Sequence, residues 1–163
     1  MSEVIVDTNA AVVANRQNTD VTGSCADACI LFLSNARDQH VVLIDCGDEI
    51  RAEYAKALRT SRPYELGALF LMHIYQHQYN PKRVRRVELQ KPEGGEFVDF
   101  PKLPELAGFD LDDRKFAALA KKTGVPVTTA IDSDWADYLP SLKANDIAVN
   151  FLCGCEKAKW FEE

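Results

Sequence analysis

The chain has 163 residues, 47% of them hydrophobic, which is enough for one folded domain with a sizeable core. Its formal net charge of −6 argues against a protein that coats nucleic acid through bulk positive charge, although an enzyme with a locally basic groove is compatible with it. The longest apolar run, residues 66–74, is too short to cross a bilayer, and no basic, apolar leader opens the chain, so we expect a cytoplasmic protein with no membrane partner.

The first part of the chain alternates apolar strands with amphipathic helices. A buried strand over residues 4–6 ends at Asp7, and Asn9 is expected to cap a short helix through Asn15. Ser24 is expected to cap a second helix to about Arg37. A second apolar strand follows at 41–44, and helices are predicted over about 48–59 and 64–79.

The second part repeats the alternation after an irregular stretch. Residues 84–89 alternate only in part, which indicates a strand there, and Gly94, Gly95, Pro101 and Pro104 predict loops. A helix is predicted from Asp110 or Asp112 through residue 123, followed by strands at 125–129 and 147–152. Strands that are apolar on both faces and alternate with helices predict an α/β fold whose central, mainly parallel sheet is flanked by helices.

The five cysteines do not suggest a disulfide framework, because their number is odd. Their spacings also differ from those of common structural zinc sites. We expect reduced and mostly buried thiols, with a structural metal or a redox pair as the alternatives. The cysteines are Cys25, Cys29, Cys46, Cys153 and Cys155.

Acidic residues follow two of the predicted strands. Asp7 comes directly after the first strand, and Asp132 and Asp134 come just after the strand at 125–129. Asp113 lies in the first turn of the helix that precedes that strand. Ligands of open parallel sheets bind beyond the carboxyl ends of the strands, so we expect these side chains to meet at that edge.

A further acid comes from the helix after the second strand. At roughly 100° per residue, Glu53 lies at the edge of the apolar face of that helix, where it can turn into a cleft, whereas Glu49 points further toward water. We therefore prefer Glu53 and keep Glu49 in reserve. Clustered carboxylates repel one another, and a hard divalent cation such as Mg²⁺ relieves that repulsion and can activate water for hydrolysis of a phosphodiester bond.

Each of these acids also has a purely structural interpretation. Asp112 and Asp113 are good first-turn or capping residues, Asp7 could satisfy loop amides, and Glu53 could simply be solvated. Asp134 is either a ligand or a residue that orients Asp132. It is the joint arrangement that favours a metal site.

Together these segments resemble the PIN-domain nuclease family. The resemblance rests on residues 4–9 (Val-Ile-Val-Asp-Thr-Asn), on Glu53 followed by Tyr54, on the segment 110–116 and on residues 131–134. It implies a three-layer PIN-like fold over residues 1–152, with residues 61–107 as an insertion and 153–163 as a C-terminal tail. It also implies a Mg²⁺ or Mn²⁺ site with ribonuclease activity, in which Asp7, Glu53, Asp113 and Asp132 are catalytic and bind the metal together with Asp134.

The resemblance further implies supporting residues and partners. Thr8 and Asn9 would lie close to the metal site, although a role for Thr8 in the first helical turn explains its presence equally well. RNA is the expected substrate. A toxin of a toxin–antitoxin pair is one role that the family allows, with an antitoxin as protein partner, and homodimers are common among similar proteins. The alternative is a catalytically silent PIN-like module that binds RNA or protein.

A basic stretch lies inside the predicted insertion. Lys82, Arg83, Arg85 and Arg86 could follow an RNA backbone, and the nearby Tyr75 and Tyr79 could stack on a base. The structural alternative is a solvated basic edge with tyrosines in the core. In the functional interpretation, these four residues form the RNA-binding surface.

Overall fold

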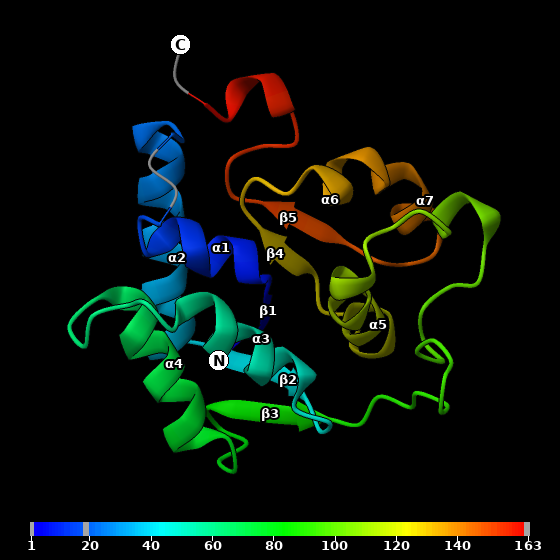
Figure 1. Cartoon of the computed structure of the whole chain (residues 1–163), viewed down its shortest axis with the longest axis horizontal. Coiled ribbons are helices and arrows are strands. Elements are labelled where there is room, and N and C mark those ends of the chain that lie inside the picture. The colour runs from blue at the N-terminus through cyan, green and yellow to red at the C-terminus, as the bar shows by residue number, and fades with distance from the viewer. Residues whose placement is uncertain (1, 18–19, 162–163) are drawn as a thin grey trace.

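A five-stranded parallel sheet forms the centre of the molecule in our computed structural model, which describes residues 2–17 and 20–161 (Figure 1). The strand order is β3-β2-β1-β4-β5, and every neighbouring pair is parallel. The predicted α/β fold with a central parallel sheet is confirmed. The strands are β1 (Glu3–Val6), β2 (Val41–Asp45), β3 (Val84–Val87), β4 (Val127–Thr129) and β5 (Val149–Phe151).

Helices cover both faces of this sheet and give the three layers expected from the sequence. Helix α2 contacts β1 and β2, whereas α5 contacts β1, β2 and β4. The chain places β2 and β3 on one side of β1, and β4 and β5 on the other side. Because crossovers between parallel strands are right-handed, helices that connect strands in these two directions lie on opposite faces, as α2 and α5 do. The helices are α1 (Thr8–Ala14), α2 (Gly23–Asp38), α3 (Glu49–Leu58), α4 (Leu66–His77), α5 (Arg114–Thr123), α6 (Ser133–Asp137) and α7 (Leu139–Ala144).

The core explains why the strands form where they do. All five residues of β2 are buried. Residues 41–44 are an apolar run covered on both faces, and the Asp45 carboxylate accepts hydrogen bonds from the backbone N–H groups of Glu49 and Ile50. Ile5 and Val6 of β1 and Val127 of β4 have no exposed surface. The strands observed for the last two predicted segments are shorter than expected, since Val125 and Pro126 lie before β4 and Leu152 lies after β5.

The helix starts differ from the predicted ones. Asp7, not Asn9, occupies the N-cap position of α1, and the Asn9 side chain instead accepts a hydrogen bond of 2.6 Å from the backbone N–H of Ile131. Thr22, not Ser24, caps α2 by accepting from the backbone N–H of Cys25. In both cases the sequence offers neighbouring polar residues with similar capping preferences, and tertiary contacts decide between them.

Residues 61–107 contribute to the same layers as the rest of the chain. Helix α4 contacts α1, α2 and α3, and β3 extends the sheet by pairing with β2 over four residues, Val84 to Val87. The short helices α6 and α7, which the sequence analysis did not predict, lie between β4 and β5. None of the helices in the described part of the chain combines the length and the apolar character needed to cross a bilayer.

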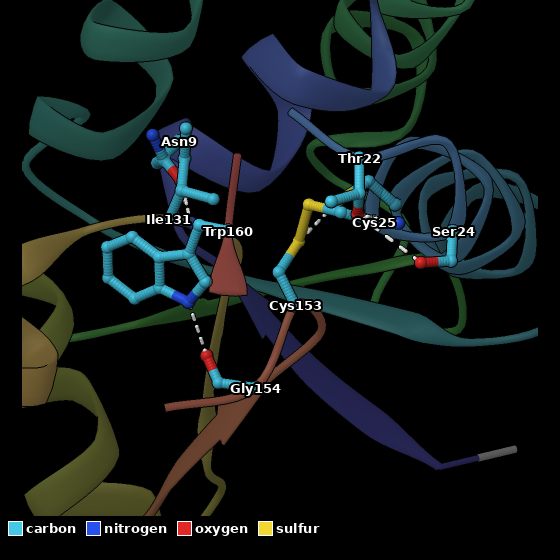
Figure 2. Close-up of a disulfide and its surroundings, with 9 residues drawn as sticks. Asn9, Thr22, Ser24, Cys25, Ile131, Cys153, Gly154 and Trp160 are labelled. Atoms are coloured by element: carbon cyan, nitrogen blue, oxygen red, sulfur yellow. Dashed lines mark hydrogen bonds between the residues drawn. A yellow bond between two sulfur atoms is a disulfide. The ribbon is translucent and has the colours of Figure 1, made fainter. Parts of the chain in front are cut away.

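The expectation of reduced thiols is wrong for one pair. Cys25 of α2 and Cys153, which follows β5, form a disulfide, and the C-terminal segment folds back beside it (Figure 2). The indole N–H of the buried Trp160 donates to the Gly154 carbonyl at 2.6 Å. Spacing along the chain could not reveal this pair, because 128 residues separate the two cysteines. Of the remaining thiols, Cys29 is buried, whereas Cys46 and Cys155 are exposed, contrary to the expected burial.

Candidate metal centre

The reversal of strand order creates a crevice between β1 and β4. These strands are neighbours in the sheet, but the chain leaves β1 toward β2 on one side and leaves β4 toward β5 on the other. Ligand sites of open α/β sheets form at such a switch point, beyond the carboxyl ends of the strands. Asp7 directly follows β1, and Asp132 lies three residues after Thr129, the last residue of β4.

Three carboxylates meet in this crevice. Asp7, Asp113 and Asp132 each offer an oxygen, and these oxygens lie within 4.8 Å of one another. Asp7 and Asp113 are buried, with 1% and 8% of their surface exposed, and Asp132 is partly exposed. The sequence predicted these three acids, and the fold brings Asp7 to the other two, which lie more than 100 residues further along the chain.

Asp7 is held rigidly by two side chains of the β4 region. Its Oδ2 accepts hydrogen bonds from the Thr129 hydroxyl at 2.7 Å and from the Trp135 indole N–H at 3.1 Å. Its backbone N–H donates to the Thr128 carbonyl at 2.9 Å, which continues the ladder between β1 and β4. Both side-chain donors fall on the same oxygen, so they fix the carboxylate plane and orient Oδ1.

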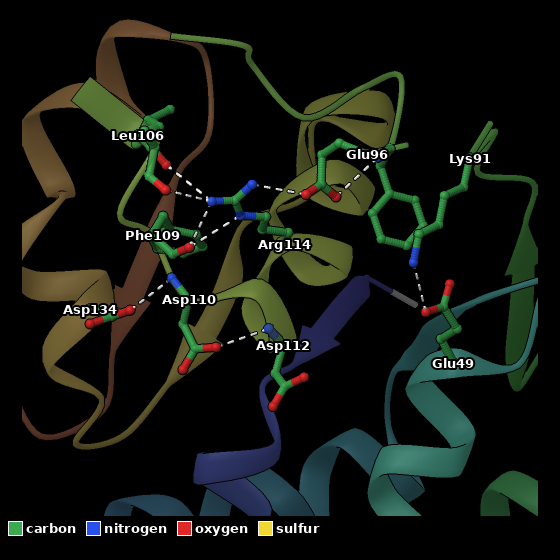
Figure 3. A network of polar contacts seen from close by, with 11 residues as sticks. Glu49, Lys91, Glu96, Leu106, Phe109, Asp110, Asp112, Arg114 and Asp134 are labelled. Carbon is green, nitrogen blue, oxygen red and sulfur yellow. Dashed lines mark hydrogen bonds and ion pairs between the residues drawn. The ribbon is translucent and has the colours of Figure 1, made fainter. Parts of the chain in front are cut away.

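Asp113 and Asp132 lie on two turns that are tied to each other. Asp113 ends the 3₁₀ turn Leu111–Asp113 before α5, and Asp132 caps α6 by accepting from the backbone N–H of Asp134 at 3.0 Å. The Asp134 carboxylate in turn accepts from the backbone N–H of Asp110 at 2.9 Å (Figure 3). Asp134 thus lies beside Asp110 and Asp113, where it joins the two turns.

Arg114 anchors the chain that leads into these turns. Its guanidinium donates to the carbonyls of Ala107 and Phe109, both at 2.9 Å, and forms an ion pair of 2.8 Å with Glu96 (Figure 3). A planar guanidinium with several donors suits this task, because it can satisfy several acceptors of an irregular segment at once. The network thereby positions Asp113 in spite of the loop-rich stretch before it.

Glu53 reaches the same crevice from α3. Its carboxylate accepts from the Thr8 hydroxyl and forms an ion pair of 3.0 Å with Lys115, a residue only 7% exposed. Glu49, the reserve candidate, instead pairs with Lys91 at the surface. The helical geometry used to choose between the two glutamates therefore agrees with where the structure places them.

Burial and mutual repulsion shift the acids toward their protonated forms. Burial, then the charges of Asp132 and Glu53, raise the pKa of Asp7 to about 7, against the lowering effect of the Thr129 and Trp135 hydrogen bonds. Burial and the charges of Asp7 and Asp132 raise the pKa of Asp113 to about 10. The pKa of Asp132 is also raised, mainly by burial. Three acids with raised pKa values in one crevice form a strongly negative site when ionised.

The acids open into a pocket with a basic rim. The pocket has a volume of about 540 Å³, the size of sites that hold small ligands. Lys56 of α3 and Arg59, which directly follows α3, are exposed and line it, and Thr8 and Asn9 line it from α1. The lining thus combines a carboxylate centre with cations that a polyanion could contact.

The basic residues predicted to bind RNA do not gather at this pocket. Lys82 and Arg83 precede β3 and therefore lie at the amino edge of the parallel sheet, opposite the acids. Arg85 pairs with Glu3 at 2.9 Å, and Arg86 pairs with Asp48 at 2.9 Å. Arg85 and Arg86 are adjacent strand residues, whose side chains point to opposite faces of a sheet, so the four cations do not form one surface with the acids. RNA binding by these residues stays a prediction.

Sequence reasoning missed five residues around the acids: Thr129, Trp135, Lys115, Lys56 and Arg59. Two signals could have indicated some of them. Lys56 follows Glu53 by three residues, and Arg59 follows Lys56 by three, which places them along one side of α3. Thr129 ends β4 beside the strand that leads to Asp7. Trp135 and Lys115 gave no such signal, because only the folded chain brings them to the acids that they contact.

The donor set fits a hard divalent cation. Carboxylate oxygens from three segments converge, and Mg²⁺ and Mn²⁺ take such ligands together with water. A cation would also offset the repulsion that raises the pKa values of these acids. The residues that could hold it are Asp7, Asp113 and Asp132, with Glu53 on the adjoining pocket wall.

Comparisons with protein-family models, with curated proteins and with solved structures found no match for this chain.

Proposed function

We propose that this chain is a metal-dependent ribonuclease that hydrolyses phosphodiester bonds in the pocket beyond β1 and β4. The observation that carries the proposal is the convergence of Asp7, Asp113 and Asp132, whose oxygens lie within 4.8 Å, at the switch point of a parallel sheet. Asp7 is the innermost of these ligands, and Mg²⁺ or Mn²⁺ is the proposed cofactor.

When bound, the divalent cation lowers the pKa of water and stabilises negative charge on the phosphoryl group. The remaining tasks belong to the chain. Thr129 and Trp135 hold Oδ2 of Asp7, which leaves Oδ1 as the oxygen that would bind the ion. Lys115 and Thr8 hold Glu53 at the pocket wall. Glu53 there adds a fourth negative charge to the site, beside the three aspartates.

RNA is the proposed substrate because the pocket combines its acids with an accessible basic rim. Lys56 and Arg59 are exposed at the rim and can contact phosphates on either side of the bond that is cleaved. Because this rim belongs to α3, the proposed RNA path follows α3, in place of the stretch at 82–86. A chain with a net charge of −6 needs such local cations to hold a polyanion.

We also propose that the protein acts in the cytoplasm, where RNA substrates are plentiful. That compartment is reducing, so the Cys25–Cys153 pair would be present there as thiols. Fractionation of cells that express a tagged chain tests this location directly.

The experiment that tests the proposed function is cleavage of single-stranded RNA in Mn²⁺ by the wild type and by Asp7→Asn. The amide has nearly the same shape as the carboxylate but no charge, so cleavage should fall more than about 100-fold, beyond the loss typical of residues that only orient a ligand. Asp146→Asn is the matched control, because this carboxylate is 90% exposed and lies outside the pocket.

Two results would contradict the proposal in different ways. If Asp7→Asn cleaves RNA as fast as the wild type, the activity does not come from this site. If the wild type binds RNA but does not cleave it in Mg²⁺ or Mn²⁺, the chain is a silent binding module.

A further inference from the structure

Three cysteine sulfurs meet where α2 approaches the end of β5. Cys25 and Cys29 are one helical turn apart on α2, and Cys153 is the second residue after β5. All three Sγ atoms lie within 4.8 Å of one another. Figure 2 shows Cys153 reaching across to Cys25 from the C-terminal segment. The cluster thus uses two distant segments, as structural metal sites do.

A disulfide accounts for only two of these sulfurs. Cys25 and Cys153 are bonded, while Cys29, with no exposed surface, keeps its Sγ 3.9 Å from that of Cys153. Reduction by a dithiol would deliver two electrons and two protons to the Cys25 and Cys153 sulfurs and would convert the reductant into its own disulfide. Three thiols would then share one largely buried site.

The spacing of these sulfurs matches a tetrahedral thiolate site. A zinc–sulfur bond of about 2.3 Å in a tetrahedron places two sulfurs roughly 3.8 Å apart. The Cys29–Cys153 separation already has this value within 0.1–0.2 Å, at 3.9 Å. Cys25 and Cys29 have i, i+4 spacing on α2, which directs both sulfurs to one side of the helix. The Cys25–Cys153 contact would have to widen, and reduction removes the bond that holds it.

We propose that Cys25, Cys29 and Cys153 of the reduced chain bind one zinc ion as thiolates, with solvent as the fourth ligand. On binding, each thiol loses its proton to the buffer and its sulfur donates an electron pair to the ion. Thiolates favour zinc, whereas the carboxylates of the acidic pocket favour Mg²⁺ or Mn²⁺, so the two sites select different metals. The zinc site would tie the segment after β5 to α2, as the disulfide does in the oxidised chain. The inference does not depend on the proposed nuclease activity.

The zinc content of the oxidised and the reduced wild type tests this proposal without any substitution. After incubation with zinc and desalting, the reduced chain should retain one ion that the oxidised chain does not. Cobalt offered to the reduced chain should give the intense near-ultraviolet absorption of thiolate-to-cobalt charge transfer. Equal zinc content in both redox states, or no retained zinc in either, would overturn the proposal.

Variants then assign the ligands. Cys29→Ala should lose the reductant-dependent zinc and the cobalt absorption, because only two thiolates remain. Cys46→Ala is the matched control, since Cys46 is a free, exposed thiol outside the cluster, and it should retain both signals. Asp7→Asn should also retain both, which separates this site from the acidic pocket. Circular dichroism of each variant checks that it is folded, and retention of zinc by folded Cys29→Ala would refute the assignment.

Discussion

Asp113 illustrates how a residue can weaken the fold while it serves a site. It is only 8% exposed and shares the crevice with two other acids, which together with burial raise its pKa to about 10. Above neutral pH, any fraction of the chain that ionises Asp113 has a buried charge without a cation to balance it. The metal-free protein is therefore less stable than its core alone would allow.

Replacing that carboxyl by an amide should separate stability from activity. We expect Asp113→Asn to raise the melting temperature of the metal-free protein at pH 8 by about 3 °C. In a chain of this size, that shift corresponds to an increase of roughly 1 kcal/mol in the free energy of unfolding. The same variant should lose Mn²⁺-dependent cleavage. Differential scanning calorimetry in a chelator gives the melting temperature, with Asp146→Asn as a control that should not shift it. A lower melting temperature for Asp113→Asn would show that the carboxyl group stabilises the fold.

Trp135 offers a test of how Asp7 is oriented. Trp135→Phe removes the indole N–H that donates to Asp7 at 3.1 Å, while an aromatic ring still packs edge-on against Phe109. We expect the affinity for Mn²⁺ to fall about 10-fold or more, since partners that orient a metal ligand have effects of that order. Titration calorimetry measures the affinity. Trp160→Phe, which loses a hydrogen bond to Gly154 outside the pocket, should keep the wild-type value.

At the scale of elements, α5 carries several of the groups that build the site, and its C-terminal end is fixed by backbone conformation. Gly124 ends α5 with φ of +73°, in the left-handed region, and its N–H donates to the Ala120 carbonyl at 2.8 Å. A side chain costs about 1–2 kcal/mol in this conformation, whereas glycine adopts it freely. The position therefore stabilises the turn from α5 into β4.

Gly124→Ala should lower the free energy of unfolding by about 1 kcal/mol or more, because alanine is strained at this positive φ. The added methyl group would meet no atom within 4 Å, so a steric clash would not contribute. Urea denaturation measures the change. Gly23→Ala is the matched control: it lies at the first residue of α2, where an added methyl group meets no atom within 4 Å, and it should be neutral or slightly stabilising. Equal effects of the two substitutions would contradict the conformational explanation.

For the whole molecule, the raised carboxyl pKa values predict how stability depends on pH. Unfolded aspartates titrate near pH 3.9, but folded Asp7 and Asp113 hold their protons to about pH 7 and about pH 10. Between these limits the folded state binds more protons, so its stability falls as pH rises. Below pH 6.5 the buried His73, with its pKa lowered to about 4 mainly by burial, acts in the opposite direction.

The window from pH 6.5 to pH 9 therefore isolates the acids. In a chelator, we expect the melting temperature to fall steadily across this window. With excess Mn²⁺ the fall should be reduced or reversed, because a cation binds the ionised acids more tightly as protons leave. Thermal unfolding at several pH values with and without Mn²⁺ measures both effects. A melting temperature that rises with pH in the chelator would contradict the raised pKa values.

The sequence predicted the parallel sheet because its central strands contain continuous apolar runs at residues 4–6 and 41–44, and β2 is buried at every position. It indicated Asp7 and Asp132 because the ends of parallel strands share one edge, and it indicated Asp113 from its place in the first turn of the helix that leads to the same edge. It could not indicate Trp135 or Lys115, whose contacts with Asp7 and Glu53 span 128 and 62 residues. The Cys25–Cys153 pair could not be predicted for the same reason, because no short sequence pattern indicates a contact between cysteines 128 positions apart.

The pairing of β1 with β4 joins Val6 to Thr128, so the acids assemble late in synthesis. A ribosome-bound chain that has emerged only as far as α5 already contains Asp7, Glu53 and Asp113, but it has neither β4, which pairs with β1, nor Asp132. Such a nascent chain has no complete carboxylate cluster. Under the proposed function, β4 and Asp132 must therefore be synthesised before any ribosomal or messenger RNA nearby could meet an assembled nuclease site.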